Sequence, residues 1–372
     1  MDAEDHLRLK VRLLTEGATL PESEASGRKG GAGPVGARYF LLPNGRSCGV
    51  PIRRGEMAER FGSAPLRSTG DPSVWLYDGN IQLRTVPRPN FYDCTTKDGV
   101  PYGQIALLHG NSTLATTVYQ ACRYWDGGEQ CKFCTIPTSY LSGDTPLEKQ
   151  PDQIAEVVSV AESEGIITDV LLTTGTPHDS SEMGAERLIP IVKRIRESSD
   201  IPIGVQIEPP RDQRVIEELA KAGANAIGLH IESADESVRE KICPGKYGYG
   251  PLDLYRQSWV SALKFFGRGN VSTFILQGLG ERTETTLGLV EELAKMGVLP
   301  IVAPIRPATG SQLADYVPSY AGSLEQSVEL YKEVGRILHR WDINPSKTAA
   351  GCHLCGGCTP IQEAYDWAAS VS

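Results

Sequence analysis

The chain has 372 residues, of which 40% are hydrophobic and 39 are glycine, and its formal net charge is −9. This composition is typical of a soluble α/β protein with many loops, and a single barrel with extensions accounts for the length. The negative charge has no basic stripe to offset it, which argues against general nucleic-acid binding. No apolar run approaches the roughly 18–20 residues of a membrane span.

The first residues, Met-Asp-Ala-Glu-Asp-His, are acidic and lack the basic and apolar blocks of a signal peptide. We therefore expect a cytoplasmic protein without membrane association. The nine cysteines are an odd number, and six of them fall in two tight triplets. That distribution indicates metal sites rather than a framework of disulfides.

Residues 1–115 are predicted to form a β-rich extension. Short alternating or apolar runs at 35–42 and 73–86 are cut by Pro-Asn-Gly and Asp-Gly turns, which predicts hairpins. A glycine-rich loop at 27–34 carries Arg28 and Lys29. Its backbone N–H groups can cradle an anion, and a plain linker is the alternative.

From about residue 116 the pattern changes to alternating strands and helices. Strands are predicted at 116–120, 169–175, 203–208, 226–232, 271–277 and 299–304. Helices are predicted at 154–161, 185–197, 215–221, 254–266, 285–296 and 324–341. Near-continuous apolar strands in this order predict a partial (β/α)6 TIM-like barrel over 116–321, followed by a C-terminal helix and cysteine-rich tail over 322–372. A doubly wound open sheet is the alternative.

The first cysteine triplet consists of Cys122, Cys131 and Cys134. Cys131 and Cys134 are separated by two residues, so one tight turn can aim both sulfurs at one metal centre. Three thiolates can hold three corners of an iron–sulfur cube and leave the fourth iron open to a small molecule. A zinc knuckle or free neighbouring thiols are the alternatives, although zinc requires four ligands and no fourth Cys or His stands close by.

The second triplet is Cys352, Cys355 and Cys358, with two equal gaps and two glycines that permit a strained turn. We predict a second iron–sulfur cluster here. A zinc site that uses His353 or a distant cysteine, or free thiols, are the alternatives. Cys48, Cys94 or a serine can supply a fourth ligand. Cys243 is a further candidate, but an ordinary thiol is the simpler interpretation.

Polar and glycine residues follow the predicted strands, at the edge where a parallel barrel gathers its chemistry. A carboxylate there can accept hydrogen bonds from ribose hydroxyls, glycines let backbone approach a flat ring, and an arginine can bind a carboxylate or phosphate. Such residues can equally be helix caps or solvated loops. The candidates are Thr173, Thr174, Gly175, Thr176, Glu232, Gly278, Gly280, Glu281 and Arg306.

The first triplet and the β/α series over about 116–310 resemble the radical S-adenosylmethionine (radical SAM) superfamily, although the usual cysteine spacing of three then two residues is eight then two here. The resemblance implies that Cys122, Cys131 and Cys134 hold a [4Fe–4S] cluster whose fourth iron binds the amine and carboxylate of SAM. It places Thr173–Thr176 at the family's Gly-Gly-Glu motif, without the glutamate. By the same resemblance, Glu232 stands where the family binds the ribose of SAM. Gly278–Glu281 corresponds to the family's motif that supports the adenine.

More narrowly, the chain resembles biotin-synthase-related proteins, which share the Arg-Lys-Gly-Gly-Ala-Gly-Pro loop and include radical SAM proteins of nitrilase gene clusters. Two-component lipoyl synthases are a more distant resemblance. These relatives imply reductive cleavage of SAM to a 5′-deoxyadenosyl radical, hydrogen abstraction from an unactivated C–H bond and sulfur insertion from the second cluster.

Two alternatives remain. One keeps the radical and uses the second cluster for redox chemistry in an oxidation, rearrangement or C–C bond formation. The other is a non-catalytic iron–sulfur or zinc protein that serves as a scaffold or electron carrier.

The expected partners are an aliphatic substrate, either a small molecule or bound to a carrier protein, and a reductase such as ferredoxin or flavodoxin. The lipoyl comparison adds a second radical SAM subunit.

Overall fold

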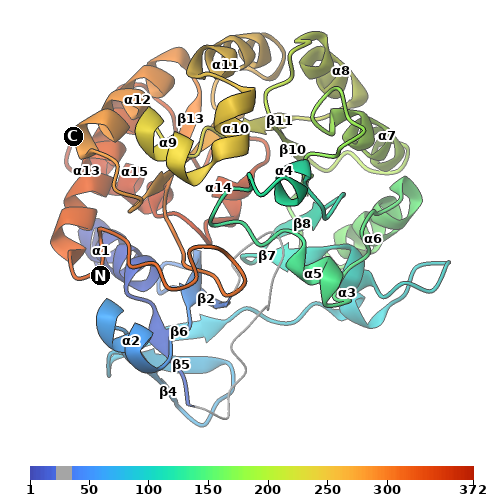
Figure 1. Ribbon diagram of the computed structural model, residues 1–372. Coiled ribbons are helices and arrows are strands. Elements are labelled where there is room, and N and C mark those ends of the chain that lie inside the picture. The colour runs from blue at the N-terminus through green and yellow to red at the C-terminus, as the bar shows by residue number, and fades with distance from the viewer. Residues whose placement is uncertain (22–35) are drawn as a thin grey trace.

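The computed structural model describes residues 1–21 and 36–372, which form two sheets surrounded by helices (Figure 1). The glycine-rich loop at 27–34, with Arg28 and Lys29, lies outside the described residues, so its predicted role stays a prediction. No helix in the described ranges has the length and apolar character needed to cross a bilayer.

The N-terminal sheet has six strands in the order β1-β4-β5-β6-β2-β3. Its strands are β1 (Ala18–Thr19), β2 (Ala37–Leu41), β3 (Ser47–Pro51), β4 (Ala64–Ser68), β5 (Val74–Tyr77) and β6 (Ile81–Thr85). Strands β2 and β3 pair antiparallel, as do β5 and β6, which confirms both predicted hairpins. In the β5–β6 turn, Asp78 and Gly79 have φ of +47° and +84°, the left-handed backbone that Asp-Gly turns favour.

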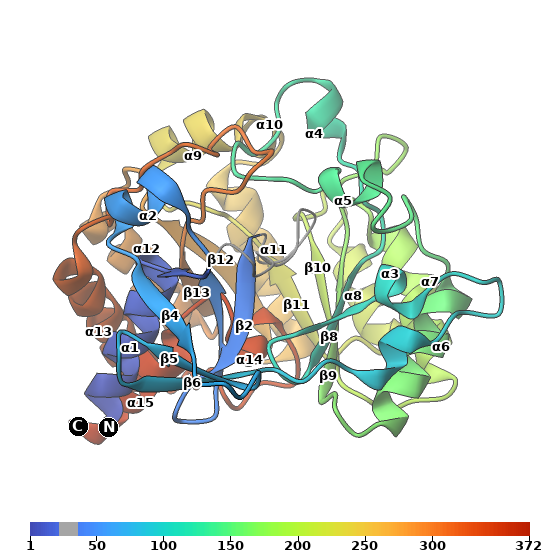
Figure 2. The same cartoon turned by 90° about the horizontal axis from the view of Figure 1, so that it is seen from below.

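The second sheet has seven strands in the order β13-β12-β11-β10-β9-β8-β7. Its strands are β7 (Leu107–His109), β8 (Thr113–Thr117), β9 (Asp169–Thr173), β10 (Ile203–Ile207), β11 (Ala226–Leu229), β12 (Val271–Gln277) and β13 (Leu299–Pro304). Strands β8 to β13 are parallel and adjacent in chain order, whereas β7 pairs antiparallel with β8 at one edge. The sheet curls around its inner face without closing (Figure 2).

The strand predicted at 116–120 is β8 in the structure, and it begins and ends three residues earlier, at 113 and 117. Its register explains the shift, because Thr113 pairs with Asp169 and Thr117 with Thr173 along β9. Beyond Thr117 the chain leaves the sheet toward the cysteine loop. The predicted domain boundaries at 115/116 and 321/322 stay predictions, and β7 lies before the first of them in the same sheet as β8.

The long helices lie on the outer face of this sheet, where their apolar sides pack on the strands. They are α6 (Pro151–Ser163), α7 (Ala185–Arg196), α8 (Arg214–Ala222), α11 (Leu252–Phe266), α12 (Thr283–Met296) and α13 (Leu324–Arg340), all at predicted positions. The shorter helices were not predicted. These include α2 (Gly55–Phe61), α3 (Tyr102–Ile105), α4 (Arg123–Asp126), α5 (Thr138–Leu141), α9 (Glu236–Ile242) and α10 (Pro244–Tyr249).

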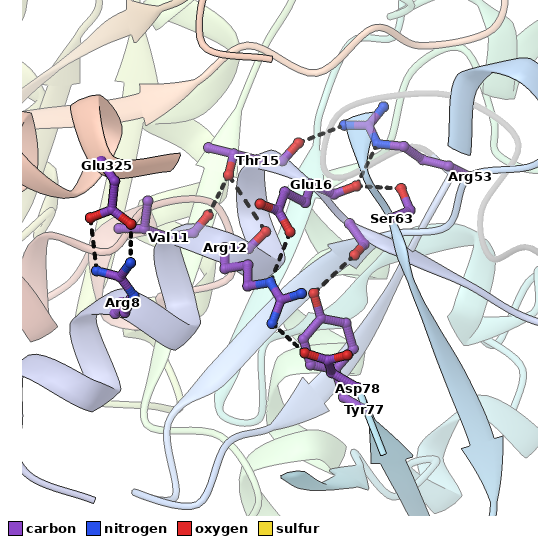
Figure 3. Close-up of polar contacts among 11 residues, drawn as sticks. Arg8, Val11, Arg12, Thr15, Glu16, Arg53, Ser63, Tyr77, Asp78 and Glu325 are labelled. Atoms are coloured by element: carbon purple, nitrogen blue, oxygen red, sulfur yellow. Dashed lines mark hydrogen bonds and ion pairs between the residues drawn. The ribbon is translucent and has the colours of Figure 1, made fainter. Parts of the chain in front are cut away.

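Helix α1 (Ala3–Thr15) was also not predicted, and it packs against β3 and the last helices of the chain. A capping box between Asp2 and Asp5 begins the helix. Arg12 forms ion pairs with Glu16 at 2.8 Å and with Asp78 of the β5–β6 turn at 2.6 Å, and Arg8 pairs with Glu325 of α13 (Figure 3). The first residues of the chain therefore pack against both its N-terminal sheet and its last helices.

The C-terminal tail folds back inside the curled sheet, where α14 (Cys352–Cys355) lies within the ring of helices (Figure 1). Gly351 N–H donates to Asp169 Oδ2 at 3.2 Å, and Ala349 N–H donates to Asn270 Oδ1 at 2.8 Å. Both acceptors stand at the start of strands, so the tail lies at the N-terminal end of the sheet. Helix α15 (Ile361–Ser370) then packs on α13 and α1, where Lys10 and Glu363 form a fully buried ion pair at 2.9 Å.

Candidate functional site

The first cysteine loop is held in place by hydrogen bonds to its neighbours. Cys134 N–H donates to the carbonyl of Cys131 at 2.9 Å, which makes the predicted tight turn. Glu208, just beyond β10, accepts from Tyr124 Oη at 3.0 Å and from Thr176 Oγ1 at 2.5 Å. This buried carboxylate therefore joins the loop to two strand ends. Glu208 was not among the predicted site residues, although it ends a predicted strand.

Gly175 and Thr176 also support the cysteine loop, and their predicted cofactor-binding role stays a prediction. A Cβ on Gly175 would overlap the carbonyl of Ala121, so only glycine lets the loop pass this close to the end of β9. Gly175 N–H donates to Tyr119 O at 2.9 Å, and Arg123 N–H donates to Thr176 O at 2.8 Å. These contacts fix the chain immediately before and after Cys122.

The cysteines of the loop differ in exposure, because Cys131 is buried and Cys122 and Cys134 are half-buried. Burial raises the pKa of Cys122 and raises that of Cys134 to about 12, and each is also raised by the charge of Cys131. Such thiols stay protonated on their own, and a metal is what stabilises buried thiolates. No three His, Cys, Asp or Glu side chains in residues 1–21 and 36–372 are arranged to hold a single ion. Cluster cysteines each bind a different iron, so three thiols on one loop are a donor set that an iron–sulfur cluster can use.

Cys243 packs in the same buried cluster as Cys131, although it was predicted to be an ordinary thiol. A hydrogen bond with Cys243 is the main cause that raises the pKa of Cys131, ahead of burial. Backbone bonds hold the two segments together, because Lys132 N–H donates to Ile242 O at 2.9 Å and Gly245 N–H donates to Glu129 O at 3.0 Å. Cys243 is therefore a fourth thiol in contact with the first triplet.

Glu232 follows β11 in a left-handed conformation, with φ of +69°, which is uncommon for a non-glycine residue and typical of functional sites. Its Oε1 lies 2.6 Å from Nζ of Lys246, and the side chains are 10% and 15% exposed. Burial alone would lower the pKa of Lys246, but Glu232 and Cys131 outweigh it and raise that pKa well above its usual range. The charged pair thus stands next to the first triplet.

The turn after β12 is built by its own residues. Gly278 and Gly280 have φ of +101° and +94°. Glu281 accepts from the N–H groups of Gly278 and Leu279, each at 2.7 Å, so its carboxylate caps the turn. A Cβ on Gly278 would lie 2.6 Å from the ring of Tyr320. The adenine-supporting role of this motif stays a prediction.

Arg306 faces the second triplet. Its Nη2 donates to Gly357 O at 2.9 Å, between Cys355 and Cys358. Thr173 and Thr174 line the same cavity as Arg306, and the hydroxyls of Thr173 and Thr117 are 2.9 Å apart. The predicted carboxylate or phosphate ligand of Arg306 stays a prediction.

The second triplet forms one turn, in which Cys355 is buried and Cys352 and Cys358 are half-buried. A hydrogen bond between Cys352 and Cys358 raises the pKa of Cys352 well above its usual range and lowers that of Cys358 to about 6. Arg306 and Lys10 lower the Cys358 value further. Gly357 N–H donates to Cys355 Sγ at 3.4 Å. Three thiols beside the Arg306 cation are suited to an anionic iron–sulfur cluster.

Among the predicted fourth ligands of this triplet, a serine lies at the turn, since Ser47 contacts it, whereas Cys48 points away. Cys94 is exposed. Ser47 donates to Cys355 O and Gly49 N–H donates to Gly357 O at 2.9 Å, so Cys48 between them points to the opposite face of β3, into the core with Phe40 and Leu13. Nε2 of His353 is hydrogen-bonded to Thr348, and burial lowers the pKa of His353 to about 3.

One cavity of about 400 Å³ reaches both triplets. The predicted site residues that line it are Thr173, Thr174, Glu232, Arg306, Cys134, Cys352, Cys355 and Cys358. Those outside its lining are Cys122, Cys131, Gly175, Thr176, Gly278, Gly280 and Glu281. The walls are mainly apolar and include Ile105, Leu107, Leu171, Phe274, Leu276 and Ile305. His230 also lines it, and Nδ1 accepts from Phe274 N–H at 3.1 Å, while burial lowers the His230 pKa to about 3.

Comparisons with known proteins give one curated relative with broad coverage. It is bacteriochlorophyllide c C-7(1)-hydroxylase of Chlorobaculum limnaeum, 25% identical in an alignment of 348 positions that covers 87% of this chain and 83% of the relative. Similar solved structures include the FeFe-hydrogenase maturase HydG from Carboxydothermus hydrogenoformans, at 18% identity and a TM-score of 0.46, with 62% of this chain and 51% of HydG covered. This chain thus spans about half the length of HydG. A radical SAM methyltransferase from Sphaerobacter thermophilus has 16% identity and a TM-score of 0.44, with 77% and 78% covered.

The family model of the radical SAM superfamily matches residues 127–295, from the cysteine loop through α12. The matched stretch contains Cys131, Cys134, Glu232 and the Gly278–Glu281 turn. This match supports assignment of the chain to the radical SAM superfamily, whose enzymes use a [4Fe–4S] cluster and SAM.

Proposed function

We propose that this enzyme cleaves SAM reductively and takes a hydrogen atom from an unactivated C–H bond of an apolar substrate held between two iron–sulfur clusters. One observation carries the proposal: the same cavity is lined by Cys134 and by Cys352, Cys355 and Cys358. The first triplet lies beyond the C-terminal end of β9, near Thr176, and the second lies by Asp169 at its start. A substrate in the cavity therefore touches both sites.

Cys122, Cys131 and Cys134 would hold the first cluster. When bound, the reduced cluster supplies one electron that breaks the sulfonium–C5′ bond of SAM, which yields methionine and a 5′-deoxyadenosyl radical that becomes 5′-deoxyadenosine on taking hydrogen. Lys246, beside Cys131, offers a cation for the SAM carboxylate. Glu232 keeps a second carboxylate oxygen for the ribose hydroxyls. Reduced ferredoxin or flavodoxin would supply the electron.

The protein's own contribution beyond the cysteines is a dry, shaped space. The apolar walls formed by Leu171, Phe274 and Leu276 exclude water and keep the radical near the substrate. The walls also define the substrate class, because an aliphatic chain fits them better than a charged molecule. If the lipoyl-synthase resemblance holds, the chain is carried on a protein, and a second radical SAM subunit takes part.

Cys352, Cys355 and Cys358 would hold the second cluster. When bound, such a cluster supplies either a sulfide that joins the substrate carbon or an oxidised iron that accepts the electron of the substrate radical. Its place on the cavity wall supports sulfur insertion, because atom transfer requires contact. The similarity to a hydroxylase over most of the chain supports the second candidate, oxidation of the substrate carbon.

Anaerobic reconstitution with iron and sulfide, followed by dithionite and SAM, tests the proposal. We expect about eight irons per chain for two [4Fe–4S] clusters, and formation of 5′-deoxyadenosine. Zinc at both triplets, or no cleavage of SAM by a fully loaded first cluster, would contradict it and favour a scaffold or electron carrier. Mass spectrometry of the product separates sulfur insertion from oxidation, since only insertion adds sulfur and erodes the second cluster.

A further inference from the structure

Arg306 has two hydrogen-bonding ends with different surroundings. Its Nη2 donates to Gly357 O at 2.9 Å, in the middle of the second cysteine turn. Its Nη1 is buried and has no hydrogen-bond partner in the protein. A guanidinium always carries its charge, and an unpaired buried N–H of a charged group is costly. The side chain therefore lacks a partner at this end.

The surroundings of Nη1 show the direction in which that partner lies. A Cβ on Gly49 would be 3.3 Å from Nη1 and 2.9 Å from Gly357 O, so the guanidinium sits between β3 and the cysteine turn. The charge of Arg306 acts on Cys358 and on Tyr39, whose hydroxyl is 3.9 Å from Cys355 Sγ. Arg306 also lines the cavity with all three cysteines of the triplet.

Other groups at the turn are already paired, so they do not compete for this role. Lys10 Nζ is bonded to Glu363 at 2.9 Å, and this buried pair is neutral as a whole. Gly357 N–H is directed at Cys355 Sγ. Arg306, in contrast, brings a charge and an N–H without a protein acceptor to an anionic site.

We infer that Arg306 is a positioning residue of the second cluster: Nη2 holds the Gly356-Gly357 turn, and Nη1 donates to a sulfur of the cluster. This inference rests on the proposed second cluster. A cation that donates to cluster sulfur stabilises the reduced, more negative state and so raises the reduction potential. The role differs from the carboxylate or phosphate binding that the sequence suggested for Arg306.

The test isolates the second cluster by substituting Cys122, Cys131 and Cys134 with Ala in the full chain. In this background, Arg306→Gln, Arg306→Lys and the unchanged arginine are reconstituted and titrated with dithionite, with the reduced cluster followed by electron paramagnetic resonance. Arg306→Gln should lower the potential by about 59 mV, a tenfold change in the oxidised-to-reduced ratio for one electron. Arg306→Lys should recover part of the shift, because it keeps the charge.

Arg196→Gln is the matched control. Arg196 of α7 also donates from Nη2 to a backbone carbonyl, that of Gly223, at 2.9 Å, so its loss tests general destabilisation. We expect it to leave the potential unchanged. A loaded cluster whose potential is the same with arginine and glutamine at 306 would overturn this inference alone. Absence of iron from the second triplet in the Arg306 protein would overturn the second cluster as well.

Discussion

Nζ of Lys246 lies 2.6 Å from Oε1 of Glu232, where the two largely buried side chains meet beside Cys131. The pair joins α10 to the end of β11 across the first cysteine loop. Glu232 was predicted from its strand end, whereas Lys246 was not identified. The ion pair gives the site a fixed cation and a fixed carboxylate before any cofactor binds.

Lys246→Met should destabilise the protein by about 3 kcal/mol, because it leaves the Glu232 carboxylate buried without its partner. The double variant Lys246→Met/Glu232→Gln should recover part of this loss, since the remaining side chain is neutral. Urea unfolding of both variants measures the free energies. Equal losses in the single and double variants would show that the pair does not interact in this way.

Gly175→Ala should displace the first cysteine loop, because the new Cβ would overlap the carbonyl of Ala121. After reconstitution we expect about four irons per chain in place of about eight, with the second cluster retained. The matched control is Gly288→Ala in α12, where a Cβ meets nothing within 4 Å. Full iron loading of the Gly175→Ala protein would contradict the close approach described here.

Tyr124→Phe should loosen the cysteine loop by removing one of the two donors to Glu208. The buried carboxylate then loses a hydrogen bond, at a cost of about 1–3 kcal/mol. Thermal unfolding and retention of the first cluster during gel filtration report the effect. Tyr140→Phe on α5 is the control, since Tyr140 is 39% exposed and should change neither quantity.

Much of the barrel was predictable because its strands are continuous apolar runs between clear turn signals. The strands at 271–277 and 299–304 were predicted to the residue, and the long helices followed from their amphipathic spacing. Helix α1 was missed, although Asp2 and Asp5 form a capping box there. Its buried face includes Lys10, whose partner Glu363 is distant in sequence. Local patterns carry no information on such partners.

The cysteine triplets were visible in the sequence, but their spatial relation was not. The tail reaches the inside of the sheet through contacts with Asp169, Asn270 and Val302, all distant in sequence. The position of Cys243 was also not visible in the sequence, because it meets Cys131 only where α9 and α10 pack on the loop. The direction of Arg306, toward the second triplet, was likewise not visible. Thr173, Thr174 and Glu232 were predicted from their places at strand ends, and they line the cavity. Gly175 and Thr176 stand at a strand end too, so the sequence could not show that they contact the cysteine loop instead of the cavity.

The contact between Cys243 and Cys131 bears on the central claim, that the fourth iron of the first cluster has no protein ligand. The most direct test is electron–nuclear double resonance of the reduced first cluster with SAM labelled with ¹⁵N at its amine, in a protein whose second triplet is substituted with Ala. We predict a hyperfine coupling to this nitrogen, present in the parent and unchanged by Cys243→Ala. No coupling in the parent, with a cluster signal that changes when Cys243 is replaced, would contradict the claim.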